Sequence, residues 1–324
     1  MDDDGDYDEL DDEEGKGKGI RDVHRPLTAT QLLMADCVVL GFAFTEKLWV
    51  QFHVDLVRPP RWNDDAFDQL VLPAAQKQLV RALVDAHVRG QSAFDDVVRG
   101  KGRGLVAVLH GPPGVGKTLT AEAVAHASRR PLYVVSSGEL GTDASALEHS
   151  LSRILDMAAS WRAVVLLDEA DVFLEQRGRH DMRRNALVSV FLRLLEYYPG
   201  ILFLTTNRVE TFDAAFQSRI HVALKYGPLD AAARRTVWEN FLRRAATQSH
   251  GQGQQPQGRV DVGADGYTRL AAHPLNGRAI KNAVATAKTL ADADGSPLDV
   301  ARLEAVLRIQ REFELELAPS SEPA

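Results

Sequence analysis

The stretch GPPGVGKT, residues Gly111 to Thr118, decides the fold of this chain. It fits the G-x-x-x-x-G-K-[ST] pattern of a phosphate-binding loop. The apolar run LVAVL at 105–109 precedes it and predicts a buried strand, and residues 119–127 follow with a helical pattern. Strand, loop and helix in this order are the context that a phosphate-binding loop requires. The alternative, an ordinary Gly/Pro turn before a helix, does not explain why motif and context agree.

Each residue type in this loop contributes a different part of a phosphate site. The glycines let the backbone turn sharply and bring its N–H groups close to phosphate oxygens. The helix that begins near Lys117 directs the positive end of its dipole at the same place. Lys117 supplies a full charge for β- and γ-phosphates, and Thr118 supplies a hydroxyl oxygen for Mg²⁺. The expected nucleotide-binding residues are Gly111, Pro112, Pro113, Gly114, Val115, Gly116, Lys117, Thr118 and Leu119.

A second motif, DEAD at residues 168–171, follows the apolar run AVVLL at 163–167. Such a run fits a strand that is buried on both faces of a parallel sheet, and open α/β sheets bind ligands at the C-terminal ends of their strands. Asp168 is then placed to hold Mg²⁺, directly or through water, and Glu169 to orient or deprotonate an attacking water. Alone, two acids at a strand end often mark only a solvated end. Downstream of a complete phosphate loop, they predict a catalytic pair.

The composition is that of a globular protein, with 45% apolar and 26% charged residues in a chain of 324. Residues 1–14 carry ten acids and no base, so the whole-chain charge of −7 leaves the remainder at +3. We expect this acidic segment to be a disordered, solubilising tail, with docking to a basic surface as the alternative. The slightly basic remainder gives little support to nucleic-acid binding.

Cysteine usage and hydropathy bear on the compartment. Cys37 is the single cysteine, so no intrachain disulfide can form, as fits a reducing environment. The acidic N-terminus resembles neither a secretory signal nor a transit peptide. No stretch reaches the ~20 apolar residues of a membrane span. These features predict an intracellular soluble protein, in the cytoplasm or the nucleus.

Together these motifs resemble the AAA ATPases over about residues 62–313. The matching strings are GPPGVGKT at 111–118, LLDEAD at 166–171, ILFLTTNR at 201–208, FQSRI at 216–220 and LNGRAIKN at 275–282. Several of them look most like a fungal group of AAA ATPases. The resemblance implies ATP and Mg²⁺ as cofactors, ATP hydrolysis, a homo-oligomeric ring that is commonly a hexamer, and remodelling of a protein client.

Residue patterns and resemblance together predict the domain organisation. Alternating strand and helix patterns from 103 to 229 favour a doubly wound parallel α/β sheet, the P-loop NTPase fold class, and a wholly helical pattern follows from Asp230. The expected segments are an acidic tail (1–24), a small β-rich module (25–62), an AAA-type nucleotide-binding core (63–229), a helical lid (230–314) with a flexible loop (247–259), and a disordered tail (315–324).

The resemblance implies roles for three further residues. Asn207 would contact the attacking water or the γ-phosphate, unless it only ends a strand. Arg219 would be an arginine finger that reaches a neighbouring subunit's nucleotide, or else a surface arginine. Phe216 stands where many relatives carry a second arginine. Arg278 would be a lid arginine. If Asn276 is an N-cap, Arg278 lies in the first turn of a helix, where the helix dipole disfavours a cation. A γ-phosphate or a nearby carboxylate would offset that effect.

Two segments limit what the resemblance implies about substrates. Members that thread polypeptide carry an aromatic loop after the second strand, whereas residues 134–160 contain no Phe, Tyr or Trp. Leu140-Gly141 is at most a reduced version of that loop. A basic cluster fits a solvated loop, a pore-facing loop, an intersubunit contact or, least well, nucleic-acid binding without interleaved aromatics. Its members are Arg177, Arg179, His180, Arg183 and Arg184.

The motifs therefore favour Mg-ATP hydrolysis coupled to remodelling of a protein client. One alternative is an ATP-regulated assembly module with little turnover. Glu169 argues against it, because a pure switch needs no base beside the metal ligand. The other alternative is a nucleic-acid-dependent ATPase.

Overall fold

The computed structural model describes residues 28–90, 102–141, 143–174, 182–208, 214–248 and 260–317. The chain divides into two compact units after Pro59. Three of the expected segments fall largely or wholly outside the described residues. They are the acidic tail at 1–24, the loop at 247–259 and the C-terminal tail at 315–324.

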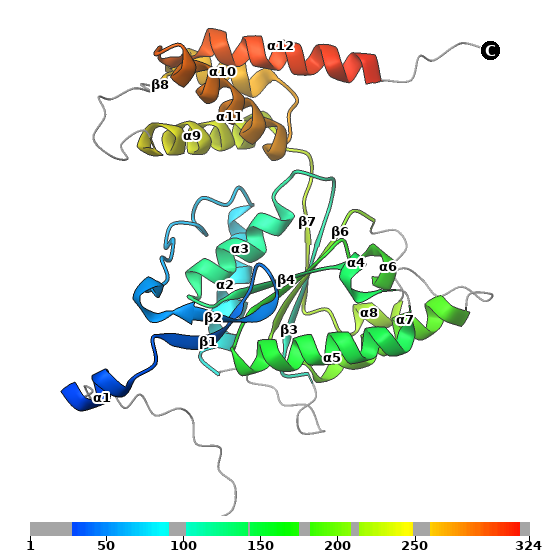
Figure 1. Ribbon diagram of the computed structural model, residues 1–324. Coiled ribbons are helices and arrows are strands. Elements are labelled where there is room, and N and C mark those ends of the chain that lie inside the picture. Colours follow the sequence, from blue (N-terminus) through cyan, green and yellow to red (C-terminus); the bar gives the residue numbers. More distant parts are fainter. Residues whose placement is uncertain are drawn as a thin grey trace, which may run out of the picture. The chain divides into compact units, whose positions relative to one another are not determined.

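The first unit contains one β-hairpin with short helical segments around it (Figure 1). Its elements are α1 (Ala29–Met34), β1 (Val38–Ala43), β2 (Leu48–His53) and the 3-10 helix η1 (Val54–Leu56). The two strands pair antiparallel. Thr28 and Gln31 start α1 with a reciprocal pair, in which each side chain accepts a hydrogen bond from the other residue's N–H. This capping box satisfies two N–H groups that a helix start leaves without partners.

The second unit is built around a five-stranded parallel sheet in the order β4-β5-β6-β3-β7. Its strands are β3 (Leu105–His110), β4 (Leu132–Ser136), β5 (Val164–Asp168), β6 (Ile201–Thr206) and β7 (Val222–Lys225). The three central strands are buried almost throughout, as their unbroken apolar runs predict for a sheet covered on both faces. The predicted doubly wound α/β class is confirmed. The phosphate loop follows the C-terminal end of β3, and the DEAD motif begins at the last residue of β5.

Helices cover both faces of this sheet (Figure 1). One face carries α2 (Ala74–Val88) and α3 (Lys117–Ala127), and the other carries α5 (Ala144–Ser160) and α7 (Met182–Tyr197). In α2, Val80 and Val84 are buried and Leu83 is partly buried, as the periodicity predicts, but Val88 is 39% exposed. The spacing therefore identified the buried side of this helix but not where that side ends, because the end depends on neighbouring elements.

Three single-turn helices were not predicted from the sequence. They are α4 (Ser137–Leu140), α6 (Asp171–Leu174) and α8 (Ala214–Gln217), and four residues are too few to display a helical period. α4 corrects one expectation about substrate threading. Leu140 is only 2% exposed and belongs to the core, so the interpretation of Leu140-Gly141 as a reduced pore loop is wrong. A side chain inside the core cannot contact a threaded chain.

The C-terminal region is a small helical body with its own core. Its helices are α9 (Ala231–Gln248), α10 (Ala264–Ala272), α11 (Gly277–Ala293) and α12 (Val300–Leu317). Trp238 of α9 and Leu303 of α12 are fully buried in this core. The expectation of a wholly helical region is wrong in one detail, because β8 (Val260–Asp261) pairs in parallel with β9 (Leu298–Asp299). Strands of two residues have no alternation to detect. Across the described ranges, no helix has the length and apolar character that crossing a bilayer requires.

Candidate nucleotide-binding and catalytic site

The phosphate loop joins the end of β3 to the start of α3. Gly114 (φ 75°) and Gly116 (φ 104°) both have positive φ values, which glycine adopts without the steric cost of a Cβ atom. Gly116 is the N-cap of α3, and the helix begins at Lys117, as the motif predicts. The loop therefore ends in a helix N-terminus, whose free N–H groups are a ready site for phosphate oxygens.

Lys117 ties the loop to the end of β6. Its Nζ atom donates to the carbonyl oxygens of Gly111 at 2.6 Å and Pro112 at 2.8 Å. The same atom donates to Oδ1 of Asn207 at 2.8 Å. The side chain is buried, with 8% of its surface exposed. The ammonium group is thus held in one position beside the loop, where a phosphate can exchange for the carbonyl oxygens as its acceptor.

Charges of both signs surround this ammonium group. Burial lowers the pKa of Lys117, the carboxylates of Asp168 and Asp171 oppose that shift, and Arg278 adds to it. Burial together with the charges of Lys225 and Lys117 also lowers the pKa of His110, the last residue of β3. This mixture of charges suits a metal-bound triphosphate. The cations can contact phosphate oxygens, and the carboxylates can bind the metal ion.

Thr118 and Asp168 form the pair that fits Mg²⁺. Oγ1 of Thr118 lies 3.4 Å from Oδ1 and 3.5 Å from Oδ2 of Asp168. Hydroxyl and carboxylate oxygens are the hard donors that Mg²⁺ takes in nucleotide sites, together with waters and phosphates. Thr205 of β6 donates from its hydroxyl to Oδ1 of Asp168. This hydrogen bond orients the carboxylate, as outer partners of metal ligands do.

Glu169 follows β5 in a left-handed backbone conformation, with φ at 55°. A residue with a side chain adopts this conformation at a cost of about 1–3 kcal/mol. Two hydrogen bonds support the turn. The N–H of Glu169 donates to Oγ1 of Thr205 at 3.0 Å, and the N–H of Ala170 donates to the Thr205 carbonyl at 2.9 Å. Backbone strain that the surroundings maintain in this way is concentrated at functional sites.

Asn207 is brought to the phosphate loop by the end of β6. Its side chain contacts Lys117, and its N–H donates to Oδ1 of Asp171 at 3.2 Å. The hydroxyl of Thr206 donates to the same oxygen of Asp171. Asp171 therefore organises the strand end from which Asn207 projects. The role of Asn207 toward a water or a phosphate stays a prediction.

Arg278 approaches the same site from the helical region. It lies in the first turn of α11, and Oδ1 of Asn276 accepts a hydrogen bond from the N–H of Ala279 at 2.8 Å. The predicted N-cap is therefore confirmed. Nδ2 of Asn276 lies 3.5 Å from the Pro113 carbonyl, and a Cβ atom at Gly114 would come within 2.8 Å of Cγ of Asn276. A glycine at 114 thus lets this helix start lie against the phosphate loop.

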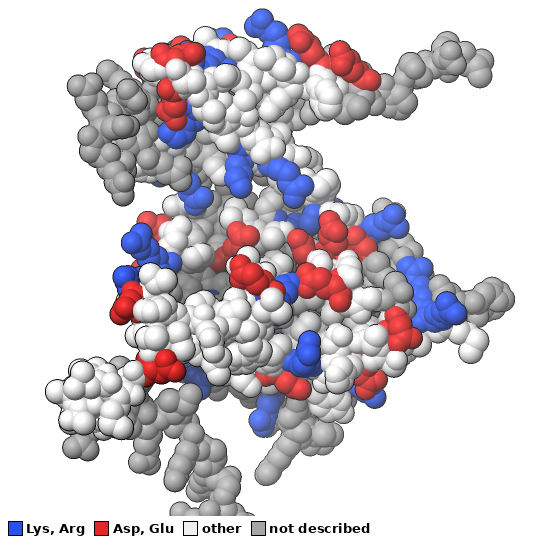
Figure 2. All heavy atoms as spheres, viewed as in Figure 1, with Lys and Arg blue, Asp and Glu red and all other residues white. Residues whose placement is uncertain are grey.

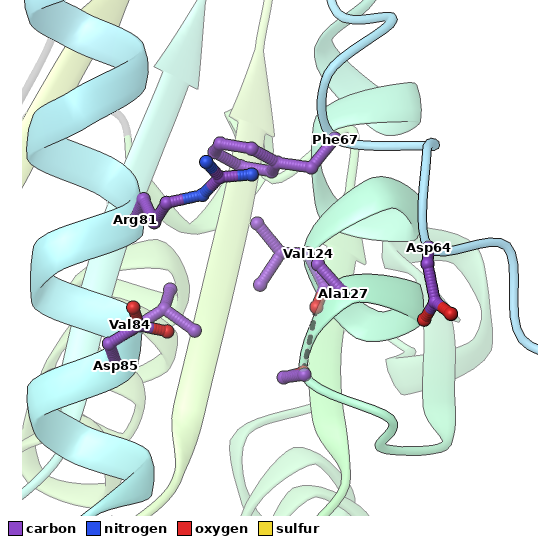
Figure 3. Close-up of a pocket in the computed structure, with 8 residues that line it drawn as sticks. Asp64, Phe67, Arg81, Val84, Asp85, Val124 and Ala127 are labelled. Carbon is purple, nitrogen blue, oxygen red and sulfur yellow. Dashed lines mark hydrogen bonds between the residues drawn. The ribbon is translucent and has the colours of Figure 1, made fainter.

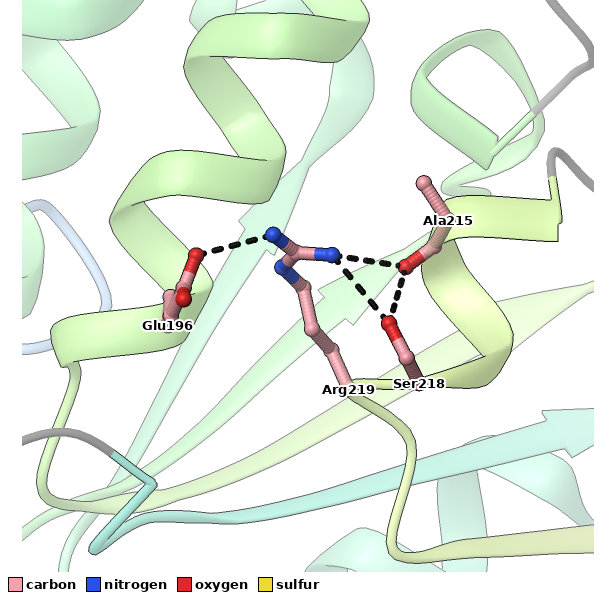
Figure 4. A network of polar contacts seen from close by, with 4 residues as sticks. All are labelled: Glu196, Ala215, Ser218 and Arg219. Atoms are coloured by element: carbon pink, nitrogen blue, oxygen red, sulfur yellow. Dashed lines mark hydrogen bonds and ion pairs between the residues drawn. The ribbon is translucent and has the colours of Figure 1, made fainter. Parts of the chain in front are cut away.

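Arg219 does not join these residues, and its contacts are instead with Glu196, Ala215 and Ser218 (Figure 4). It precedes β7 by three residues and so lies at the N-terminal edge of the parallel sheet, whereas the phosphate loop lies at the C-terminal edge. Its guanidinium pairs with Glu196 at 2.8 Å and donates to the Ala215 carbonyl at 2.9 Å. Both an action on a neighbouring chain and a purely structural ion pair fit this position.

The sequence interpretation missed three hydroxyl groups that organise the site. Thr205 and Thr206 are about 1% exposed and hold the two aspartates of the DEAD motif. Thr120 lies with its Oγ1 atom 2.6 Å from the hydroxyl of Tyr226. Burial raises the pKa of Tyr226 to about 12, and a Cβ atom at Gly111 would come within 2.1 Å of the Tyr226 carbonyl. The available signal was the Thr-Thr pair that ends the otherwise apolar run of β6.

A separate pocket of about 200 Å³ lies between α2 and α3 (Figure 3). It is lined by Val124, in the last turns of α3, and so lies at the opposite end of that helix from Lys117. The guanidinium of Arg81 lies 4.9 Å from the ring centre of Phe67 and pairs with Asp68 at 3.0 Å. The pocket lies away from the phosphate loop and takes no part in the candidate site.

The sheet order, the phosphate loop after β3 and the acid pair after β5 define an α/β P-loop nucleoside triphosphatase. The model of the ATPase family associated with various cellular activities (AAA) matches residues 107–227, and the model of the fungal AAA+ ATPase lid domain matches residues 229–315. Together the two matches cover more than half of the chain. The chain belongs to the AAA ATPases and carries a lid of the fungal type.

Curated relatives match part of the chain. The ATPase family AAA domain-containing protein FIGL1 of Arabidopsis thaliana is 31% identical over 156 residues, which are 45% of this chain and 22% of that protein. The human ATPase family AAA domain-containing protein 3B is 31% identical over 160 residues, 46% of this chain and 25% of that protein. The ATP-dependent zinc metalloprotease FtsH of Lachnoclostridium phytofermentans is 28% identical over 216 residues, 53% and 37% of the respective chains.

The chain thus matches about a quarter of the length of the first two relatives. Similarity of this extent supports ATP binding and hydrolysis in general. It does not extend to the substrates or partners of the relatives.

Proposed function

We propose that this protein binds Mg-ATP and hydrolyses it as a ring-forming homo-oligomer, with six subunits as the expected number, and uses the turnover to remodel a protein client. The core at 63–229 and the lid at 230–314 are the domains to which we assign this activity. The observation that carries the proposal is a convergence of residues distant in sequence. Lys117, the Thr118–Asp168 pair and Asn207 meet at the C-terminal edge of one sheet.

In this proposal the loop at 111–119 holds the phosphates through its N–H groups and Lys117. Thr118 and Asp168 hold Mg²⁺, which neutralises part of the phosphate charge when bound. Glu169 accepts a proton from the water that attacks the γ-phosphate, and Asn207 orients that water or the phosphate. Arg278 contacts the γ-phosphate from the lid, a role supported by the contact between Asn276 and the loop.

Arg219 has a different part in the proposal, because its own chain keeps it at the other edge of the sheet. We assign it to the nucleotide of a neighbouring subunit, where it would stabilise charge that develops on the transferred phosphoryl group. Since one chain then lacks a complete catalytic set, assembly is part of the activity.

The charge distribution favours a protein client over nucleic acid. In the view of Figure 2, acidic and basic side chains of the described residues are interspersed over the core. Arg183 and Arg184 of the basic cluster lie in the first turn of α7. Its other three members, Arg177, Arg179 and His180, fall outside the described residues. Stimulation of ATP turnover by DNA or RNA would instead support a nucleic-acid-dependent ATPase.

Steady-state turnover of the wild type beside Glu169→Gln tests the proposed chemistry. The amide keeps the shape of the side chain but removes the base, so ATP should still bind while hydrolysis slows by about 10²–10⁴-fold. Wild-type turnover in this variant would place the base elsewhere, and Asp171→Asn is the next variant to measure. Wild-type turnover as slow as that of Glu169→Gln would instead favour a regulatory module. Because Glu169→Gln should remain bound to ATP, it is also the variant to use in a pull-down of the protein client.

A further inference from the structure

We propose that Glu196 holds Arg219 in a parked position within its own chain and competes for it with the nucleotide of the neighbouring subunit. The inference rests on the proposed action of Arg219 on that nucleotide. It adds a regulatory contact to the proposed function, namely an intrachain ion pair that must open before a subunit can serve its neighbour.

Both Nη atoms of the Arg219 guanidinium group have acceptors within the same chain (Figure 4). Nη2 lies 2.8 Å from Oε2 of Glu196, and Nη1 donates to the Ala215 carbonyl at 2.9 Å and to Oγ of Ser218 at 3.3 Å. The Arg219 and Glu196 side chains are only 26% and 20% exposed. Nε is buried and has no acceptor within the described part of the chain.

A phosphate needs the same N–H groups that Glu196 and the Ala215 carbonyl now accept from. Arginine binds carboxylate and phosphate through one planar set of donors. Arg219 therefore cannot keep its full contact with Glu196 while it binds a γ-phosphate with both Nη atoms. The two anions compete, and the dianionic terminal phosphate of ATP is the stronger competitor for a shared cation.

The backbone that carries Arg219 is anchored, so release requires movement of the side chain alone. Phe216 is fully buried and its ring lies 5.9 Å from that of Phe191, which stacks on Phe173 at 5.2 Å. The N–H groups of Arg219 and Ile220 both donate to the Phe216 carbonyl, at 2.9 and 3.1 Å. Phe216, in the position of the missing second arginine, thus holds the turn from which Arg219 projects.

This arrangement ties the ion pair to assembly. In an isolated chain the pair with Glu196 satisfies the Arg219 charge, and opening it costs a charge-assisted hydrogen bond. A neighbour that presents ATP supplies a replacement anion. We therefore expect the pair to raise the protein concentration at which turnover per subunit reaches half of its maximum.

The test is the concentration dependence of ATP turnover for Glu196→Gln. Glutamine keeps the length and an acceptor oxygen but removes the negative charge, so the ion pair becomes a weaker hydrogen bond from a charged donor to a neutral acceptor. The half-activating concentration should fall by about three- to ten-fold, with the same turnover at saturation. The matched control is Glu148→Gln, since Glu148 pairs with Arg193 of α7 at 2.6 Å rather than with Arg219. Ser218→Ala removes another contact that holds Arg219 within its own chain. It should also lower the half-activating concentration, but by less.

The possible outcomes separate the parking contact from the proposed function. A half-activating concentration in Glu196→Gln equal to that of Glu148→Gln overturns the parking role. A higher concentration or a lower plateau overturns it too, because Glu196 would then position Arg219 for action. If Arg219→Ala keeps full turnover in the assembled state, the proposed role of Arg219 on the neighbouring nucleotide fails, and the inference fails with it. Thermal unfolding followed by circular dichroism verifies that each variant is folded.

Discussion

The Nζ atom of Lys117 lies 2.8 Å from Oδ1 of Asn207, although ninety positions separate the two residues in the chain. β3 and β6 are neighbours in the sheet and pair in parallel, so their C-terminal ends emerge side by side. The first strand leads into the phosphate loop, and Asn207 directly follows the second. The geometry of the candidate site is therefore a consequence of strand order, and we expect changes at either strand end to affect binding of the same nucleotide.

Lys117→Ala should abolish nucleotide binding. The variant loses the one full positive charge that the loop contributes, and charge-assisted phosphate contacts are the strong ones. Isothermal titration calorimetry with ATP measures the effect. Lys225→Ala is the control, because Lys225 pairs in register with His110 at the end of β7 but lies outside the loop. Unchanged ATP affinity in Lys117→Ala would show that the loop is not the phosphate site.

Thr205→Val should weaken both the fold and the response to Mg²⁺. Valine has nearly the same shape, but Asp168 loses a donor and the partly buried N–H of Glu169 loses its acceptor. An unsatisfied buried group of this kind costs about 1–3 kcal/mol of unfolding free energy. Urea unfolding measures the loss of unfolding free energy. ATPase activity at increasing Mg²⁺ concentrations measures the Mg²⁺ requirement.

Thr206→Val is the matched control for that variant, since Thr206 donates to Asp171 and not to Asp168. It should lose stability without a comparable rise in the Mg²⁺ requirement. Equal Mg²⁺ requirements in the two variants would mean that Thr205 has no particular influence on the metal ligand.

Arg219→Ala should leave the ATP affinity of the isolated chain intact and reduce turnover strongly in the assembled state. Arginine fingers in phosphoryl transfer contribute about 10³–10⁵-fold, and Arg219 contacts no residue of its own nucleotide site in the described structure. Turnover per subunit should rise with protein concentration in the wild type and stay flat in the variant. A wild-type rate that does not change with concentration, down to a demonstrated monomer, contradicts the trans role.

A mixture of Arg219→Ala and Lys117→Ala should recover part of the activity. The first variant keeps an intact nucleotide site, and the second supplies an intact Arg219 to face it. Neither variant alone can form a complete site. The measurement is ATPase activity at constant total protein across mixing ratios, and activity that only averages the two separate rates would argue against shared sites.

Asn276→Ala should loosen the start of α11 and lower ATP affinity modestly. The variant loses the cap on the Ala279 N–H, which is worth about 1 kcal/mol to a helix. It also loses the side chain that lies against the phosphate loop. Asn276→Asp keeps the cap and serves as the control. Hydrogen exchange at the first turn of α11 should increase in the alanine variant alone, and equal exchange in both would contradict the capping role.

Local patterns predicted much of this molecule correctly. The apolar runs at 105–109 and 163–167 became central strands, because burial on both faces demands an unbroken apolar sequence. The start of α3 at Lys117 and the Asn276 cap followed from rules that involve only neighbouring residues. Single-turn helices and two-residue strands could not be predicted in this way, because they depend on contacts rather than on a period.

The sequence by itself determined the class of the protein, since the phosphate loop and the acid motif each carry their chemistry in consecutive residues. Only the tertiary structure decided which side chains support that chemistry. Thr205 reaches Asp168, and Glu196 reaches Arg219, across segments that the chain order leaves unrelated. The physical reason is that hydrogen bonds and ion pairs depend on distances of a few ångströms, and strand order and helix packing set those distances.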